Sequence, residues 1–292
     1  MARKAAATAG DKPKVRKGSK TTLSEANLAD LGAERLAAIL LDLASDSHVK
    51  RVLRLELFAE ASAEGLALEI SKRLATIGKS SSRIHWRKRP AFARDLDLHR
   101  RMIERLAEDD ATAALSLMLD LLDLASPTLD RLSQPDGPIG DVFLAARDSI
   151  GAIAEKAVPE PIALAERTAK ILATDYHAQM GPLASALASA MGPQGRAHLR
   201  QVLETVLAMN AKRLRGADPM AAVYKDALRR LADASGDIDA FEATFAPELR
   251  RTPLVSAEIA RRLLAAGRGE DALATLQAGA PGEARGRHPT SV

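Results

Sequence analysis

Where the chain is regularly apolar, its apolar residues recur with the period of an α-helix. Leu36, Ile39, Leu40 and Leu43 stand at positions i, i+3, i+4 and i+7, a spacing that places all four side chains on one helix face. The longest run of this kind lies within residues 194–214. No segment alternates convincingly with the period of two that a half-buried strand requires. The sequence therefore predicts an all-α protein.

The composition fits helices packed on helices. Hydrophobic residues make up 47% of the chain but aromatic residues only 3%, whereas sheets draw on aromatic and β-branched side chains. Glycine and proline separate helical segments of roughly 10–20 residues, and short connections of this kind join antiparallel neighbours. We expect an antiparallel helical-hairpin array, solenoid-like, with disordered N- and C-terminal tails.

The last hairpin before the C-terminal tail, within residues 255–279, resembles the helix-turn-helix unit of tetratricopeptide-type repeats. Gly267-Arg268-Gly269 would form its turn. Small and large apolar residues are predicted to pack its two helices together, namely Ala260, Leu263, Leu264, Ala272, Leu273 and Leu276.

Four regions are predicted from composition. Residues 1–20 hold seven Lys/Arg, one Asp and few apolar side chains, and such a segment cannot bury enough surface to become ordered. A helical half at 21–157 and a second, repeat-like half at 158–279 meet at the proline-rich stretch Val158 to Pro161. The tail at 280–292 is again predicted to be disordered.

Several protein classes are excluded or disfavoured by what the sequence lacks. There is no cysteine, which removes disulfides and thiolate metal sites. No apolar run approaches the roughly 18 residues of a membrane span, and the N-terminus carries no apolar signal region. We expect a cytoplasmic protein with no membrane association and no cofactor.

Positive charge is concentrated in one internal stretch. The chain has a net charge of +4, yet the range 72–101 alone carries ten Lys/Arg against two acids. Its middle, residues 78–90 (the basic loop), is the clearest break in helical periodicity and contains the single tryptophan. The candidate partner-binding residues lie there: Lys79, Arg83, His85, Trp86, Arg87, Lys88 and Arg89.

Two interpretations of the basic loop are open. An exposed Trp86 could stack on an unpaired base while the cations neutralise phosphates. Alternatively, Trp86 tucks into the helical body and anchors the loop, which is the commoner position for a lone tryptophan.

Other polar groups suggest chemistry only weakly. Asp95 and His99 are four residues apart on one predicted helix, with His85 a conceivable third ligand. A hydrogen-bonded core histidine is the commoner outcome on an apolar stripe, since acid–base work also needs a cleft and a second group. Asp136 and Asp141 flank a glycine-rich turn but lack the ligand spacing of a calcium loop. We predict no catalytic residues and no metal site.

Five short motifs in the N-terminal half carry a family resemblance: NLADLG from Asn27, KRVLRLE from Lys50, ISKRL from Ile70, Trp86-Arg87 and GDVF from Gly140. By these motifs, residues 20–156 resemble an uncharacterised bacterial family of all-helical proteins of unknown function, with looser likeness afterwards. In that family the position before the tryptophan is usually acidic, whereas His85 stands here. The resemblance implies the helical fold and no activity.

We therefore expect a non-enzymatic helical scaffold or adaptor that binds a protein partner. The alternative is a nucleic-acid-binding protein that uses the basic loop and the basic N-terminal tail.

Overall fold

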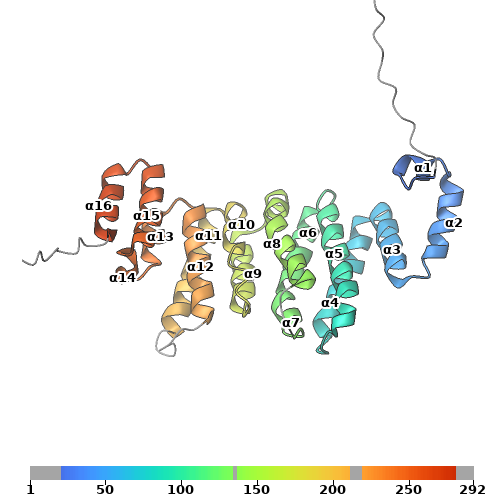
Figure 1. The fold of residues 1–292 in the computed structure, drawn as a ribbon, viewed down its shortest axis with the longest axis horizontal. Helices are drawn as coiled ribbons and strands as arrows, with labels where there is room; N and C mark the ends of the chain where they lie inside the picture. The colour runs from blue at the N-terminus through green and yellow to red at the C-terminus, as the bar shows by residue number, and fades with distance from the viewer. Residues whose placement is uncertain (1–20, 134–136, 211–218, 281–292) are drawn as a thin grey trace, which may run out of the picture. The chain divides into compact units, whose positions relative to one another are not determined.

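The computed structural model describes residues 21–133, 137–210 and 219–280. Within these ranges the chain forms sixteen α-helices and one 3-10 helix and no strand, so the all-α prediction is confirmed (Figure 1). None of the described helices is both long and apolar enough to cross a membrane. The predicted tails fall almost wholly on 1–20 and 281–292, which lie outside the described residues.

Contacts along the chain divide it into two compact units, Met1–Arg54 and Leu55–Val292. The first unit contains α1 (Glu25–Ala29), α2 (Ala33–Leu43) and the start of α3 (Ser47–Ala61). Polar side chains cap the N-termini of α1 and α3. Ser24 Oγ accepts from the Asn27 N–H at 3.3 Å, and Asp46 Oδ1 accepts from the His48 N–H at 2.8 Å. No residue between 21 and 54 is buried.

The second unit begins with the rest of α3 and holds the core. Its first helices are α4 (Ala63–Lys79), η1 (Trp86–Lys88), α5 (Arg89–Leu106), α6 (Ala111–Asp123), α7 (Ala125–Leu129) and α8 (Pro138–Ala157). The helices α4, α5, α6 and α8 pack on one another. Leu96, Ile103, Met118 and Phe143 are fully buried between them, and the periodic apolar positions therefore form the core of this part.

The chain continues with α9 (Pro161–Ala173), α10 (Leu183–Ala186), α11 (Ala188–Asn210) and α12 (Pro219–Ala234). Val158, with φ at 45°, turns the chain between α8 and α9. The helix α9 packs closely on α11, which is kinked at Gly192. Helices on both sides of residue 158 touch, since α6 contacts α9. The division into halves at this point and the solenoid-like arrangement stay predictions.

The last helices are α13 (Ile238–Ala243), α14 (Pro247–Arg250), α15 (Pro253–Ala265) and α16 (Gly269–Gly279). The hairpin of α15 and α16 turns at Gly267, whose φ of 75° lets the Arg268 N–H reach Leu263 O at 2.8 Å. Ala260, Leu263 and Ala272 are buried as predicted.

Three leucines of the same hairpin were predicted to pack inward, and that prediction is wrong. Leu264 and Leu273 are each 58% exposed and Leu276 is 41% exposed. The helix α15 contacts α13, α14 and α16, whereas α16 packs mainly on α15. Among the described residues no helix covers these three leucines.

Candidate partner-binding surface at the basic loop

The basic loop connects α4 to α5 through a short extended segment. The sequence predicts that Gly78 ends α4, but the helix continues to Lys79, and Ser80 follows with an extended backbone. Ile84 is the buried residue of the loop, 8% exposed, and its N–H donates to Arg131 O at 3.0 Å. A short apolar side chain and one backbone hydrogen bond thus anchor the middle of the loop to the segment after α7.

The side chain of Arg131 holds the loop from the other side. Its Nε donates to Ser82 O at 2.8 Å, its Nη2 to Ser80 Oγ at 3.0 Å and its Nη1 to Ile77 O at 3.4 Å. Burial lowers the pKa of Arg131 from its ordinary value. The guanidinium is still charged at neutral pH, because arginine does not lose its proton in proteins.

Arg89 has a similar supporting position. Its Nη2 donates to Ser133 Oγ at 2.7 Å and its Nε to Ile84 O at 3.5 Å. Of the predicted binding residues, Arg89 is therefore the one whose side chain is engaged in holding the loop.

Trp86 lies on the surface, which overturns the core-anchor interpretation. It is 64% exposed and stands at the start of η1. The His85 ring lies 5.7 Å from the tryptophan ring, and the Arg87 guanidinium lies 5.0 Å from the ring centroid. His85 Nδ1 accepts from the Arg87 N–H at 3.3 Å, so this nitrogen is unprotonated when the bond forms. Ile84 fills the anchoring role that the sequence had suggested for Trp86.

Four cations of the basic loop carry no counter-charge from the described residues. Lys79, Arg83, Arg87 and Lys88 are all exposed, and within the described ranges none of them forms an ion pair. The loop therefore presents one open aromatic ring and four uncompensated positive charges on a backbone held by Arg131 and Ile84.

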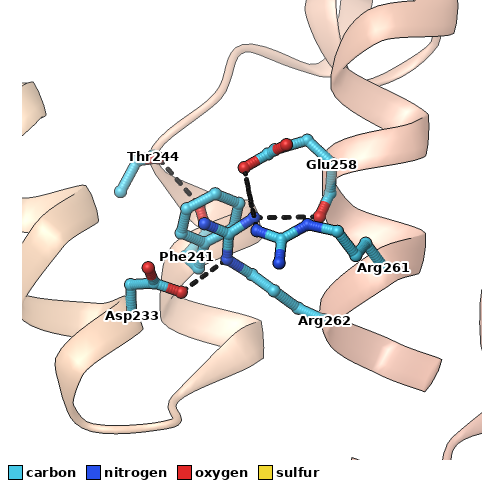
Figure 2. Close-up of polar contacts among 6 residues, drawn as sticks. All are labelled: Asp233, Phe241, Thr244, Glu258, Arg261 and Arg262. Carbon is cyan, nitrogen blue, oxygen red and sulfur yellow. Dashed lines mark hydrogen bonds and ion pairs between the residues drawn. The ribbon is translucent and has the colours of Figure 1, made fainter. Parts of the chain in front are cut away.

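The Arg262 cluster of the second unit shows the opposite arrangement. Its guanidinium lies across the Phe241 ring at 3.8 Å, between Asp233 and Glu258 (Figure 2). Nε donates to Asp233 Oδ1 and Nη1 to Glu258 Oε1, each at 2.6 Å. Burial lowers the pKa of Arg262, but its two carboxylate partners outweigh burial and raise it overall. We assign a structural role to this fully paired arginine, which joins α12, α13 and α15.

The two residues considered for acid–base chemistry, Asp95 and His99, are held in hydrogen bonds within the core. Asp95 and His99 are buried at 4% and 2% exposure. Arg73 Nε donates to Asp95 Oδ2 at 2.8 Å, and His99 Nδ1 lies 2.7 Å from Asp95 O. A carbonyl can only accept, so Nδ1 carries the proton. This cluster ties α4 to α5 and is the hydrogen-bonded core histidine that the sequence favoured.

The candidate metal ligands are not brought together. Within the described residues no group of three His, Asp, Glu or Cys side chains could hold a metal ion. Asp141 lies exposed in the first turn of α8, and Asp136 falls outside the described residues.

Comparison with known proteins finds no curated protein and no solved structure that matches the chain. The model of one family, described as a family of unknown function (DUF6880), matches residues 18–291. The match reaches well beyond the half of the chain over which the sequence resemblance is clear. The chain therefore belongs to this family of unknown function.

Proposed function

We propose that this protein is a non-catalytic helical adaptor that binds an acidic segment of a partner protein at the basic loop. The observation that carries the proposal is an exposed Trp86 ring in a loop with four exposed cations, which form no ion pair within the described ranges. Tryptophan and arginine are the residues most enriched in binding hot spots.

The charges argue for an acidic partner. A surface cation that already forms an ion pair within its own protein attracts a partner only weakly. By contrast, only a group outside the described residues can supply a counter-charge to Lys79, Arg83, Arg87 and Lys88. Complementary charge speeds encounter and selects the partner. The open ring supplies the apolar contact that charge alone does not give.

The adaptor function is further supported by the absence of carboxylates from the basic loop, since a carboxylate would be the usual partner for acid–base work with its histidine. Its exposed side chains are cations, serines, an imidazole and an indole, and it brings no carboxylate to the surface. The buried Asp95 and His99 are occupied by Arg73 and by the backbone.

Single-stranded nucleic acid is the second candidate, favoured by the same tryptophan. An exposed ring beside cations can stack on a base while the cations contact phosphates. The two candidates differ in salt dependence, because binding to a phosphate backbone releases condensed counterions and weakens steeply with salt.

A titration of the tryptophan fluorescence tests both. The probes are an acidic peptide of Glu and Leu and a single-stranded oligodeoxythymidine, each at low and at physiological salt. We expect the peptide to bind and to persist at physiological salt. Tighter binding of the oligonucleotide at both salt concentrations would make nucleic acid the partner. Failure of both probes at low salt would overturn both functions.

Matched variants locate the site. Reversal of Arg87 and Lys88 to Glu should abolish peptide binding. Reversal of two other exposed cations, Lys225 and Arg251, changes the net charge equally and should leave binding intact. Arg89 is left unchanged in this test because it holds the loop. Equal losses in both double variants would show only nonspecific attraction.

A further inference from the structure

The N-terminal hairpin, residues 21–46 with α1 and α2, exposes apolar side chains that nothing else among the described residues of its own unit buries. Leu23 is 85% exposed, Leu41 is 74% exposed and Leu43 is 51% exposed. Neither helix contains a buried residue. Helices gain most of their stability from packing an apolar face, so this hairpin needs a covering surface.

The exposed face contains a shallow, open groove. Leu23, Leu28, Ala29 and Leu36 line it together with Ser24 and Glu25, and its volume is about 550 Å³. Leu23 precedes the helix-capping Ser24, and Leu28 is the fourth helical residue. Residues at these two positions often pack against each other and fix the entry of a helix. Here Leu23 stays 85% exposed, so both side chains remain open to a ligand, and Leu36 of α2 adds the other wall of the groove.

The hairpin around the groove is acidic. Residues 21–46 contain five Asp/Glu and a single basic residue, Arg35. Glu25, Asp30, Glu34 and Asp42 are exposed, and the described part of the chain offers none of them an ion pair. Of these acids, Glu25 lines the groove itself, and the others lie on the same hairpin. An apolar groove on an acidic hairpin favours an apolar ligand that carries positive charge.

We propose that this groove binds a basic amphipathic helix of a partner protein. A groove between two helices accepts apolar side chains spaced i, i+3, i+4 and i+7 on a third helix. Lys and Arg on the flanks of that helix would meet Glu25 and the other acids of the hairpin. The chain's own residues 1–20 are basic, but their only large apolar residues are Met1 and Val15, too few for the groove. Two copies of this hairpin placed face to face would bring negative charge against negative charge, and like charges repel.

The test uses the full chain and three labelled synthetic peptides of about five helical turns. The first carries Leu at helical spacing with Lys elsewhere. The second replaces Lys by Glu, and the third keeps the Lys/Leu composition with the Leu positions scrambled. Fluorescence anisotropy should show the first peptide binding at least tenfold more tightly than either of the others. Equal binding of the ordered and scrambled Lys peptides would reduce the effect to bulk charge and overturn the proposal.

Two pairs of variants place the peptide on the groove. Leu23→Ser with Leu28→Ser should weaken binding of the first peptide about tenfold. Should circular dichroism show that this variant loses helix, the second pair decides. Glu25→Gln with Glu34→Gln should weaken binding about fivefold, whereas the matched double variant in the second unit, D141N/E155Q, should leave it unchanged.

Two outcomes would sink the idea independently of the basic loop. One is a groove-charge variant that binds as tightly as the wild type. The other is a protein that binds no peptide and self-associates in sedimentation, which would assign the groove to a second copy. Trp86→Ala should not change peptide binding here, so this result and the result for the basic loop are separable.

Discussion

The single tryptophan provides a direct test of the surface described for the basic loop. Trp86 is the only tryptophan of the chain and is 64% exposed. Its fluorescence should be quenched by small ions in solution, and the neighbouring cations should make the quenching depend on the sign of the ion. We expect iodide to quench more efficiently than caesium.

The size of the effect follows from the Arg87 guanidinium, which lies 5.0 Å from the ring centroid. An ion touching the ring at a similar distance interacts with this charge by about 0.8 kcal/mol in water. Screening at physiological ionic strength, where the Debye length is about 8 Å, reduces this to about 0.4 kcal/mol. That energy raises the local iodide concentration about twofold and lowers caesium about twofold, a ratio of about four. Arg83, Lys88 and Lys79 can only increase it.

The assay is a pair of Stern–Volmer titrations at constant ionic strength, each divided by the result for free N-acetyltryptophanamide. The Arg87→Gln variant is the matched control, and its iodide-to-caesium ratio should fall toward that of the free compound. A wild-type ratio no larger than that of the free compound would refute the cationic surface. Protection from both ions would refute the exposure of the ring.

The remaining predictions concern stability. Ile84→Ala should lower the free energy of unfolding by about 2–4 kcal/mol, as loss of a buried aliphatic side chain does, whereas Trp86→Ala should lower it by about 1 kcal/mol; the reverse order in urea denaturation would refute the anchoring role of Ile84. Arg131→Ala should expose the basic loop to trypsin at least tenfold faster, since three side-chain hydrogen bonds are lost, and unchanged cleavage would contradict its supporting role. Hydrogen bonding from Arg262 holds the pKa of Glu258 below its ordinary 4.5, so its stabilisation is present above that value and is lost as pH falls through the lowered pKa. Glu258→Gln should therefore reduce stability at pH 7 by about 0.5 kcal/mol, in the range of exposed ion pairs, and this difference should shrink as the pH falls below 4.5 through the lowered pKa; a difference that grows in acid would contradict the sign.

The helices were predictable because their signal is local. The spacing of the apolar residues in α5 and α6 fixes which side chains face inward, and Ile103 and Met118 are fully buried. Caps such as Asp46 act within three residues and could also be read from the sequence. The outward position of Leu273 was not predictable, because its burial depends on which other helices pack against α16, and the spacing within one helix does not show that.

The sequence predicted which residues form the candidate surface, but one interpretation of it, a buried Trp86, was wrong. The charge density marked Arg87 and Lys88, and both are exposed. The general preference of tryptophan for burial suggested an anchor, but the smaller Ile84 occupies that place. Arg131 lies 49 residues beyond Ser82, to which it donates, and no local pattern indicates such a pairing. The isolated branched apolar residue among cations was the one signal that could have identified Ile84.

The bonds from Arg131 make the binding surface depend on a distant segment of the chain. Ser80, Ser82 and Ile84 keep their places only while residues near Arg131 are folded against them. By thermodynamic linkage, a ligand that binds only the ordered loop must stabilise that distant segment as well. Occupation of the loop should therefore slow amide hydrogen exchange in α7, although α7 contributes none of the exposed cations. The rate of hydrogen exchange in α7 and the affinity of the loop for its ligand would then both report the same equilibrium, between the ordered and the released loop.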